Sequence, residues 1–366
     1  MTRAKRDVLK ESKRVIVKLG TSSILHKDGR LQGEVLLPLA RQIGLLLERG
    51  IQVVLVSSGA VGMGKRTQAG AQIESKQLAS KQALAALGQV ELMNMWRGLF
   101  ELLGIGVAQV LLTRQELSRR ERYLNARNTL STLLAAGILP IINENDSVAT
   151  DEIRFGDNDI LAALVSSVIE ADLVVNLTRA EGLLDLSNNP AEPILISEVQ
   201  EVNEELFDMV APEISTGGTG GMASKLHAAK EAARFGATMV IANSEQDNVL
   251  IDILEGKEVG TLFCPAEQPL RGRKRWLASS TLVSGSVTID NGAAKALQDK
   301  GSSLLGVGVL EIEGEFGIGD ILSLRSESGQ ELGRGLSEKS STELKTSIAD
   351  KGVVVVHRDN LFFRRQ

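Results

Sequence analysis

The stretch Ile51-Gln52-Val53-Val54-Leu55-Val56 runs directly into Ser57-Ser58-Gly59-Ala60-Val61-Gly62-Met63-Gly64. A strand that is apolar at nearly every position is typical of a sheet whose two faces are both covered by helices. Small residues directly after such a strand allow a ligand or a helix to approach its end closely. The spacing is not Gly-x-Gly-x-x-Gly, so it does not indicate a dinucleotide site.

Similar apolar runs alternate with amphipathic runs over residues 1–270. Strands are predicted at 15–19, 51–56, 107–112, 138–142, 173–177 and 238–242, and helices at 36–49, 121–136, 160–170, 202–210 and 222–235. Residues 75–103 also look helical, with Gly88 as a predicted break. This alternation indicates βαβ crossovers. We therefore predict an α/β domain with a mainly parallel sheet sandwiched by helices, and ligands at the carboxyl ends of its strands.

The composition narrows the class of protein. The chain has 366 residues, of which 43% are hydrophobic and only 3% aromatic, and 36 are glycine. Small aliphatic side chains and many tight turns fit an α/β protein. The formal net charge of −5 gives no general attraction to nucleic acid or anionic membrane. One cysteine, Cys264, and three scattered histidines exclude a disulfide framework and argue against a His/Cys zinc site.

No apolar run is long enough to cross a bilayer, so we expect no membrane association. The basic residues Met1–Arg6 are not followed by an apolar region, so we do not expect a signal peptide. They are predicted to form a short solvated lead-in. The expected location is cytoplasmic.

The stretch Gly217-Gly218-Thr219-Gly220-Gly221-Met222-Ala223-Ser224-Lys225 leads into the helix predicted at 222–235. Glycines bring backbone N–H groups close to a ligand, and the helix N-terminus adds free N–H donors and partial positive charge. Such a turn suits a phosphate, with Lys225 within reach. It is not a Walker A loop, because Ser224 precedes Lys225. Taken alone, the stretch fits an ordinary glycine-rich loop equally well.

Lys18 ends the first predicted strand, between Val15-Ile16-Val17 and Leu19-Gly20-Thr21-Ser22-Ser23. A lysine among buried β-branched residues is costly unless its ammonium emerges at the strand end, towards a charge partner. A surface lysine is the alternative interpretation. The predicted topology places Lys18 and Ser58 at the same edge of the sheet.

A polar segment follows the strand at 138–142. It contains Asn143-Glu144-Asn145-Asp146-Ser147, Asp151-Glu152 and Gly156-Asp157-Asn158-Asp159. Amides and carboxylates at the ligand-binding edge suit a polar small molecule, its amine especially, and an Asp could hold Mg²⁺ through water. The residue order of an EF-hand calcium loop is absent. A solvated surface loop is the alternative.

The character of the chain changes after residue 270. Arg271, Arg273, Lys274 and Arg275 lie in a turn-prone connector, which we place at 271–281. Short strand-like runs follow at 282–289, 307–312, 320–324 and 353–356, with helical runs at 292–299 and 337–348. We therefore predict one domain at 1–270 and a small strand-rich module at 282–366.

Several short motifs occur together along the chain. They are Val17-Lys18-Leu19-Gly20-Thr21, Ser57-Ser58-Gly59-Ala60, Ser80-Lys81-Gln82, Arg122-Tyr123-Leu124-Asn125-Ala126-Arg127, Asn143-Glu144-Asn145-Asp146, Gly156-Asp157-Asn158-Asp159 and Gly220-Gly221-Met222-Ala223-Ser224-Lys225. With these motifs the chain resembles the glutamate 5-kinase family over nearly its whole length. The tail is similar to a PUA module at Gly301-Ser302-Ser303-Leu304-Leu305 and Val356-His357-Arg358-Asp359. The resemblance implies the amino-acid kinase fold followed by a small β-rich PUA barrel.

The resemblance implies ATP-dependent phosphorylation of the γ-carboxylate of L-glutamate to L-glutamyl 5-phosphate, the first step of proline biosynthesis. The residues that it implies as catalytic are Lys18, Lys225 and Asp159, and those for glutamate are Ser58, Asp146 and Asn158. For ATP it implies Lys18, Thr178, Arg179, Thr219, Gly220, Gly221, Met222, Ala223, Ser224 and Lys225. Asp159 would orient the two lysines or help with Mg²⁺, which is expected to arrive on ATP without direct protein ligands.

The resemblance also implies partners. Proline is expected as a feedback inhibitor that acts through the loop at 143–159, and glutamyl phosphate reductase as the downstream enzyme. A homo-oligomer is expected as well.

One departure from the family pattern concerns the nucleotide. The family usually has Thr-Asp where this chain has Thr178-Arg179, and Gly-Leu-Tyr where it has Gly182-Leu183-Leu184. The charge at Arg179 is thus reversed, and we expect an altered affinity for ATP.

Two alternative functions fit parts of the sequence. The first is a kinase of aspartate or N-acetylglutamate, which the tail and the segment Asn143-Glu144-Asn145-Asp146 argue against. The second is an RNA-binding protein, because PUA modules bind RNA in other proteins. The acidic residues of the tail argue against this second function; they are Glu311, Glu313, Glu315, Asp320, Glu327 and Glu331.

Overall fold

The computed structural model describes residues 5–74, 77–148, 157–185, 193–209, 221–267, 269–270, 276–277, 283–347, 350 and 352–363. The chain forms two compact units. One comprises Met1–Thr113 and Leu124–Pro269, and the other comprises Arg114–Tyr123 and Leu270–Gln366. The predicted connector at 271–281 lies outside the described residues except for Trp276 and Leu277.

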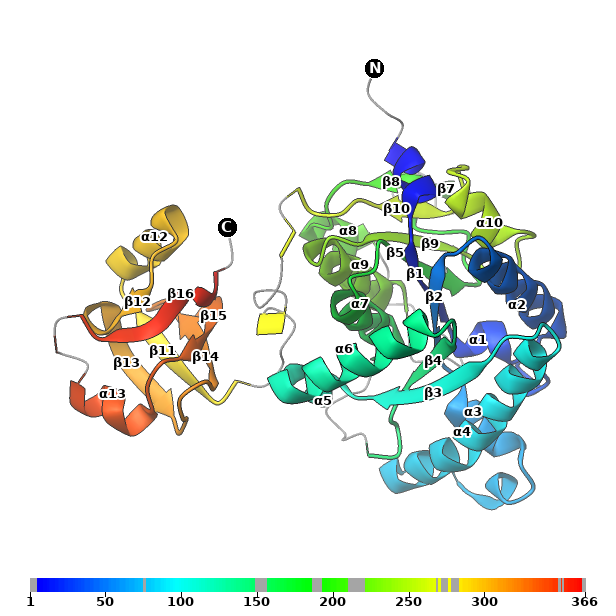
Figure 1. Cartoon of the computed structure of the whole chain (residues 1–366), viewed down its shortest axis with the longest axis horizontal. Helices are drawn as coiled ribbons and strands as arrows, with labels where there is room; N and C mark the ends of the chain where they lie inside the picture. The colour runs from blue at the N-terminus through cyan, green and yellow to red at the C-terminus, as the bar shows by residue number, and fades with distance from the viewer. Residues whose placement is uncertain are drawn as a thin grey trace. The chain divides into compact units, whose positions relative to one another are not determined.

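The first unit is built on an eight-stranded sheet with the order β3-β4-β2-β1-β5-β9-β10-β8 (Figure 1). The strands are β1 (Arg14–Leu19), β2 (Gln52–Ser57), β3 (Val107–Leu112), β4 (Leu139–Glu144), β5 (Leu173–Thr178), β8 (Glu198–Val199), β9 (Thr238–Asn243) and β10 (Thr261–Phe263). All neighbours are parallel except β9 and β10. The mainly parallel sheet is therefore confirmed, and each predicted strand lies within two residues of its expected ends. A separate hairpin joins β6 (Leu184–Asp185) to β7 (Ile194–Leu195).

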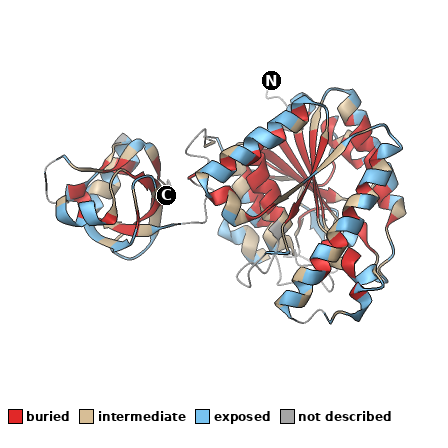
Figure 2. Cartoon of the chain, turned by 60° about the horizontal axis from the view of Figure 1, so that its bottom comes forward, coloured by how far each residue is buried: buried red, intermediate tan, exposed pale blue. Residues whose placement is uncertain are grey.

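Helices cover both faces of this sheet, and the strands between them are almost entirely buried (Figure 2). The helical segments of this unit are η1 (Lys5–Glu11), α1 (Thr21–Ile24), α2 (Gly33–Glu48), α3 (Ala60–Arg66), η2 (Gly70–Gln72), α4 (Leu78–Glu101), most of α6 (Arg120–Ala135), α7 (Asp157–Ile169), α8 (Glu204–Met209), α9 (Met222–Arg234) and α10 (Val249–Leu254). Helix α5 (Arg114–Ser118) and the first residues of α6 belong to the second unit. One core cluster joins one face of the sheet to α2, α4 and α10. Helices α7 and α9 pack on each other and on the strands from the other side.

The alternation of side chains along a strand decides which residues meet α7 and α9. Val15, Val17 and Leu19 of β1 belong to the core shared with α2, α4 and α10. Successive side chains of a strand point to opposite faces, so Lys18 faces the α7 and α9 layer. Asn176 on β5 is the register partner of Lys18, and it therefore lies on the same face.

The predicted break at Gly88 is wrong, because α4 runs without interruption from Leu78 to Glu101. The glycine instead permits close packing of α4 on α3. A Cβ atom at Gly88 would lie 1.8 Å from the carbonyl oxygen of Ala60, and one at Gly64 of α3 would lie 2.0 Å from that of Leu84. Both helices thus contribute a glycine where their backbones touch.

The N-terminal segment is more than the solvated lead-in predicted for Met1–Arg6. The guanidinium of Arg6 donates hydrogen bonds to the carbonyl oxygens of Lys257, Val259, Ser197 and Gly260. Leu9, in the same 3-10 helix, is buried. A basic residue at a chain terminus gives no sequence signal for such an anchor, because the acceptors come from residues about 190 and 250 positions away.

The second unit contains a six-stranded sheet with the order β12-β16-β15-β14-β11-β13, which curls into a half-barrel. Its elements are β11 (Gly285–Ile289), α12 (Asn291–Lys300), β12 (Leu304–Leu305), η3 (Gly306–Gly308), β13 (Val309–Gly314), β14 (Ile321–Arg325), β15 (Glu331–Ser337), α13 (Ser341–Ser347) and β16 (Val354–Phe363). Strand β15 was not predicted from the sequence, because glycines such as Gly333 and Gly335 are typical of turns. Close packing accounts for these glycines: a Cβ at Gly333 would lie 2.4 Å from the carbonyl oxygen of Phe362. The helix predicted at 337–348 is shorter, because Ser337 ends β15.

We predict that Gly88→Ala destabilises the first unit by about 1–3 kcal/mol, because the new methyl group overlaps the backbone of α3. Gly98→Ala in the same helix is the matched control, since nothing lies within 4 Å of its added Cβ. That variant is expected to gain up to about 1 kcal/mol from helix propensity. Thermal denaturation of both variants is the measurement. Equal effects of the two substitutions would contradict the packing argument.

Candidate functional site

Polar and charged side chains gather at the carboxyl edge of the parallel sheet. Lys18 lies at the end of β1, Ser58 directly follows β2, and Asn143 lies near the end of β4. The first turns of α7 and α9 add Asp159 and Lys225 to the same site. The positions follow from the βαβ topology, which brings strand ends and helix N-termini to one edge.

Asp159 links the two lysines. Its Oδ1 forms an ion pair with Lys18 Nζ, and its Oδ2 lies 3.3 Å from Lys225 Nζ. All three side chains are at most 7% exposed. The family resemblance implied that Asp159 orients the two lysines or helps with Mg²⁺, and in the structure its carboxylate contacts both ammonium groups.

The electrostatics of this cluster favour the ionised carboxylate. Burial alone would raise the pKa of Asp159, but the charges of Lys18 and Lys225 outweigh it and hold that pKa below its ordinary value. The contribution of this carboxylate to stability is therefore present above the pKa of an unfolded Asp, about 3.9, and is lost as the pH falls further. Burial lowers the pKa of Lys18, and the charge of Asp159 opposes this effect.

Asn158 connects the polar segments that the sequence analysis assigned to substrate. Its Nδ2 donates to Ser58 Oγ at 3.1 Å and to Asn143 Oδ1 at 2.9 Å. Its Oδ1 accepts from the backbone N–H of Glu144 at 3.1 Å. The segments that contain Asn143 and Asn158 thus meet at one amide. Through this side chain the first turn of α7 is hydrogen-bonded to the end of β4 and to the residue after β2.

Helix α4 supports this amide network at two points that sequence reasoning missed. Gln89 Oε1 accepts from Asn143 Nδ2 at 2.8 Å. Two turns further on, Trp96 Nε1 donates to Ser57 Oγ at 2.9 Å, and Ser57 Oγ donates to the carbonyl oxygen of Ser58. Trp96 and Ser57 are fully buried. No local motif marks Gln89 and Trp96, because their partners lie on other elements of the sequence.

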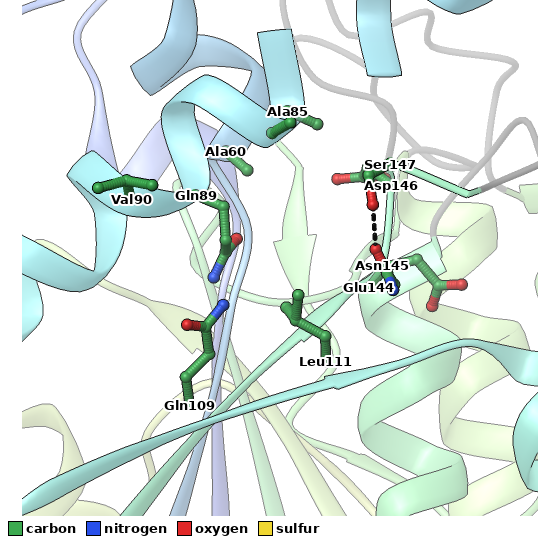
Figure 3. A pocket seen from close by; sticks show the side chains of 11 residues that line it. Ala60, Ala85, Gln89, Val90, Gln109, Leu111, Glu144, Asn145, Asp146 and Ser147 are labelled. Atoms are coloured by element: carbon green, nitrogen blue, oxygen red, sulfur yellow. Dashed lines mark hydrogen bonds between the residues drawn. The ribbon is translucent and has the colours of Figure 1, made fainter. Parts of the chain in front are cut away.

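Asp146 lines a cavity of about 180 Å³ beside the network (Figure 3). The cavity is lined by Ala60, Ala85, Ala86, Gln89, Val90, Gln109, Leu111, Glu144, Asn145, Asp146 and Ser147. Burial raises the pKa of Asp146 to about 6, so its carboxylate is mostly ionised at pH 7, and no counter-charge from the described residues offsets this burial. Such a carboxylate suits the ammonium group of a small ligand.

The structure describes some, but not all, of the residues that the resemblance implies for ATP binding. Thr178 ends β5, and the Nε atom of the next residue, Arg179, lies 3.6 Å from Glu245 Oε1 at the surface. Gly221 is the N-cap of α9, and Met222 and Ala223 begin that helix. Ser224 Oγ lies 2.7 Å from Asp159 Oδ2 and 2.8 Å from the carbonyl oxygen of Gly221. Thr219 and Gly220 lie outside the described residues, as do residues 149–156 of the predicted loop.

One further residue was overlooked although the sequence carried a signal for it. Asn176 interrupts the apolar run from Leu173 to Leu177, where a polar side chain is unfavourable unless it finds a hydrogen-bond partner. In the structure its Nδ2 donates to Asp159 Oδ1 at 2.9 Å. The charged cluster therefore includes a neutral amide from β5.

The described part of the chain contains no group of three or more His, Cys, Asp and Glu side chains suited to a metal ion. Its helices also include none that is long and apolar enough to cross a membrane. The lysine cluster and the free helix N-terminus favour a negatively charged ligand, and the amide network with Asp146 favours a polar ligand that carries an amine.

Known proteins share this organisation. Residues 13–243 match the amino acid kinase family, and residues 285–358 match the PUA domain. A glutamate 5-kinase of Thioalkalivibrio sulfidiphilus is 44% identical over 97% of this chain and 98% of its own. Those of Thermoanaerobacter sp. (43% identical, 95% and 97% covered) and Methylococcus capsulatus (42% identical, 97% and 98% covered) are similar over nearly their whole length too. A solved UMP kinase of Bacillus anthracis is 16% identical and covers 69% of this chain and 96% of its own with a TM-score of 0.49, which is too low to support an argument.

Proposed function

The chain belongs to the amino acid kinase family and, within it, to the glutamate 5-kinases, and on this premise we propose how its residues divide the work of phosphoryl transfer. Its reaction is the ATP-dependent phosphorylation of L-glutamate, the first step of proline biosynthesis. The contact of Asp159 with both Lys18 and Lys225 is the observation that carries the proposal.

Lys18 and Lys225 supply positive charge to the phosphoryl group in transfer. Negative charge spreads over the oxygens of this group in the transition state, so fixed cations stabilise it. The two ammonium groups come from different elements, β1 and α9, and Asp159 holds both. Asp159 therefore acts by orienting the lysines. The free N–H groups at the start of α9 add a partial positive charge on the same side.

Ser58, Asp146 and Asn158 bind glutamate. The carboxylate of Asp146 faces the cavity and binds the α-ammonium group. Asn158 donates its two amide N–H groups to Ser58 Oγ and Asn143 Oδ1, so it binds a substrate oxygen by exchanging one of these bonds, whereas Ser58 offers its hydroxyl hydrogen. The attacking γ-carboxylate is already ionised at neutral pH, so the reaction needs no general base.

The nucleotide binds along the ends of β5 and α9. Thr178 and Arg179 border it on one side, and Gly221, Met222, Ala223, Ser224 and Lys225 on the other. Thr219 and Gly220 directly precede Gly221 in the sequence, and they are proposed to border the nucleotide as well. Asp159 accepts from four donors already, so the described residues suit a Mg²⁺ ion that arrives on the phosphates of ATP. Mg²⁺ supplies further positive charge there.

Six other expectations stay predictions. Proline is proposed as an inhibitor that competes at the cavity beside Asp146. The product is an acyl phosphate, which hydrolyses readily, and this chemistry favours prompt use by glutamyl phosphate reductase. A homo-oligomer, a cytoplasmic location and domains at 1–270 and 282–366 joined by a linker at 271–281 are proposed as well. RNA binding by the PUA domain rests on analogy of fold alone.

The overall proposal is tested by ATP turnover in the presence of hydroxylamine, which converts an acyl phosphate to a stable hydroxamate. Glutamate is expected to give the hydroxamate, while aspartate and N-acetylglutamate give little. Added proline is expected to reduce the rate. A preference for aspartate or N-acetylglutamate would contradict the substrate assignment.

Lys225→Ala is expected to lower kcat by about 10²–10³-fold, because a charge contact to the transferred group is lost. Lys230→Ala is the matched control, since Lys230 lies on the same helix but is half exposed and pairs with Glu204. The measurement is steady-state kinetics with both substrates. A near-normal kcat for Lys225→Ala would remove this lysine from the mechanism.

Asp146→Asn is expected to raise the KM for glutamate by about 10–100-fold, with a small effect on the KM for ATP. In the unchanged protein this KM should also rise as the pH falls below about 6, because the carboxylate of Asp146 becomes protonated there. The variant should lose that pH dependence. Asp28→Asn, at an exposed carboxylate, is the control. An effect on the KM for ATP alone would contradict the assignment.

Arg179→Asp is expected to raise the KM for ATP by roughly three- to tenfold, because a cation beside the nucleotide is replaced by an anion. The substitution also breaks the ion pair with Glu245, so Glu245→Gln is measured in parallel. Equal KM values for Arg179→Asp and the unchanged protein would show that Arg179 does not influence nucleotide binding.

A further inference from the structure

Asn176 is a fully buried amide in the middle of the central sheet. It lies on β5, between β1 and β9, and its register partners are Lys18 and Ile241. Its neighbours along the strand, Val175 and Leu177, are buried and apolar. Burying an amide in such surroundings is unfavourable unless its polar atoms find partners.

Only one half of this amide is satisfied by the described residues. Nδ2 donates to Asp159 Oδ1 at 2.9 Å, whereas the buried Oδ1 has no hydrogen-bond partner among them. A leucine or valine would fill the position without the cost of that oxygen. A buried side chain that leaves one polar atom without a described partner and yet contacts the charged cluster is expected to contribute to function.

The donors around Asp159 show what the amide adds. Oδ1 accepts from Lys18 and Asn176, and Oδ2 accepts from Ser224 and Lys225. An ionised carboxylate offers about four acceptor positions, so this set fills them. Three of the donors belong to the proposed phosphate-binding elements, β1 and α9. Among these four donors, Asn176 alone is both neutral and held by a strand with neighbours on both sides.

We propose that Asn176 is a positioning residue, which fixes the carboxylate of Asp159 to the central sheet so that Lys18 and Lys225 keep their places at the transferred phosphoryl group. Lysine ammonium groups sit on flexible four-carbon chains and do not fix a carboxylate by themselves. The amide has a short side chain on a rigid strand, and it prevents rotation of the carboxylate. The inference rests on the proposed role of Asp159.

Asn176→Leu tests this role with a side chain of similar size. We expect kcat to fall roughly tenfold, as for other residues that orient a catalytic group, with both KM values nearly unchanged. The denaturation midpoint should be unchanged or higher, because the unpartnered oxygen is removed. Asn176→Val, which suits a strand, should give the same loss of kcat. A kcat close to that of the unchanged protein in both variants would overturn the inference.

Val174→Ala is the matched control for packing. Val174 lies two residues earlier on the same face of β5 and is fully buried. Its truncation is expected to lower the denaturation midpoint and to leave kcat nearly unchanged. Substitution of Asn176 should thus lower kcat without lowering the denaturation midpoint. Truncation of Val174 should lower the denaturation midpoint without lowering kcat. A loss of kcat at Val174 equal to that at Asn176 would show that packing alone accounts for the effect.

A double-mutant cycle separates this inference from the proposed function. If Asn176 acts only through Asp159, Asn176→Leu should cause no further loss of kcat in an Asp159→Asn background. An equal tenfold loss in both backgrounds would overturn the inference. Near-normal activity of Asp159→Asn itself would contradict the role of Asp159. A large loss in Asp159→Asn with normal activity in Asn176→Leu would contradict the role of Asn176 alone.

Discussion

Two buried ammonium groups and one buried carboxylate form the interaction on which the site depends. Lys18 and Lys225 are each 4–5% exposed and both contact Asp159, which is 1% exposed. Removing one partner of a buried ion pair commonly costs about 3–5 kcal/mol, because the remaining charge is left without compensation. Here two lysines share one carboxylate. A bound phosphate would bring further negative charge to the two ammonium groups, so the arrangement favours the binding of an anion.

The two carboxylates of the site have opposite environments. Cations hold the pKa of Asp159 down, so it stays ionised throughout the physiological range and organises charge. Burial raises the pKa of Asp146 to about 6, with no compensating cation among the described residues, so its ionised form would gain from a ligand's ammonium group. The proposed mechanism uses both properties: fixed charge at the phosphoryl group, and an incompletely compensated charge at the acceptor.

The helices that frame the acceptor side depend on close backbone contact. Gly64 and Gly88 allow α3 and α4 to touch, and α4 then reaches the amide network through Gln89 and Trp96. The hydrogen bonds run from α4 through β4, α7 and the end of β2 and return to α4. The network that contains Ser58 and Asn158, which we propose to bind glutamate, is thus connected at two points to one continuous helix.

The sequence by itself determined the α/β class, the order of the strands along the chain and the motifs at the carboxyl edge of the sheet. These depend on local patterns: apolar runs such as Ile51–Val56, and small or polar residues directly after them. It also indicated Lys18 and Lys225, because a lysine beside a turn of small residues combines a cation with free N–H donors and so suits an anion. The family resemblance already implied that Asp159 orients the two lysines, and the tertiary structure supplied the contacts. Tertiary structure alone decided that Gly88 is a packing contact within an unbroken helix, and that Asn176 belongs to the charged cluster. Each of these facts is a contact between residues far apart in the chain, and a local pattern records what a residue is but not which distant residue it meets.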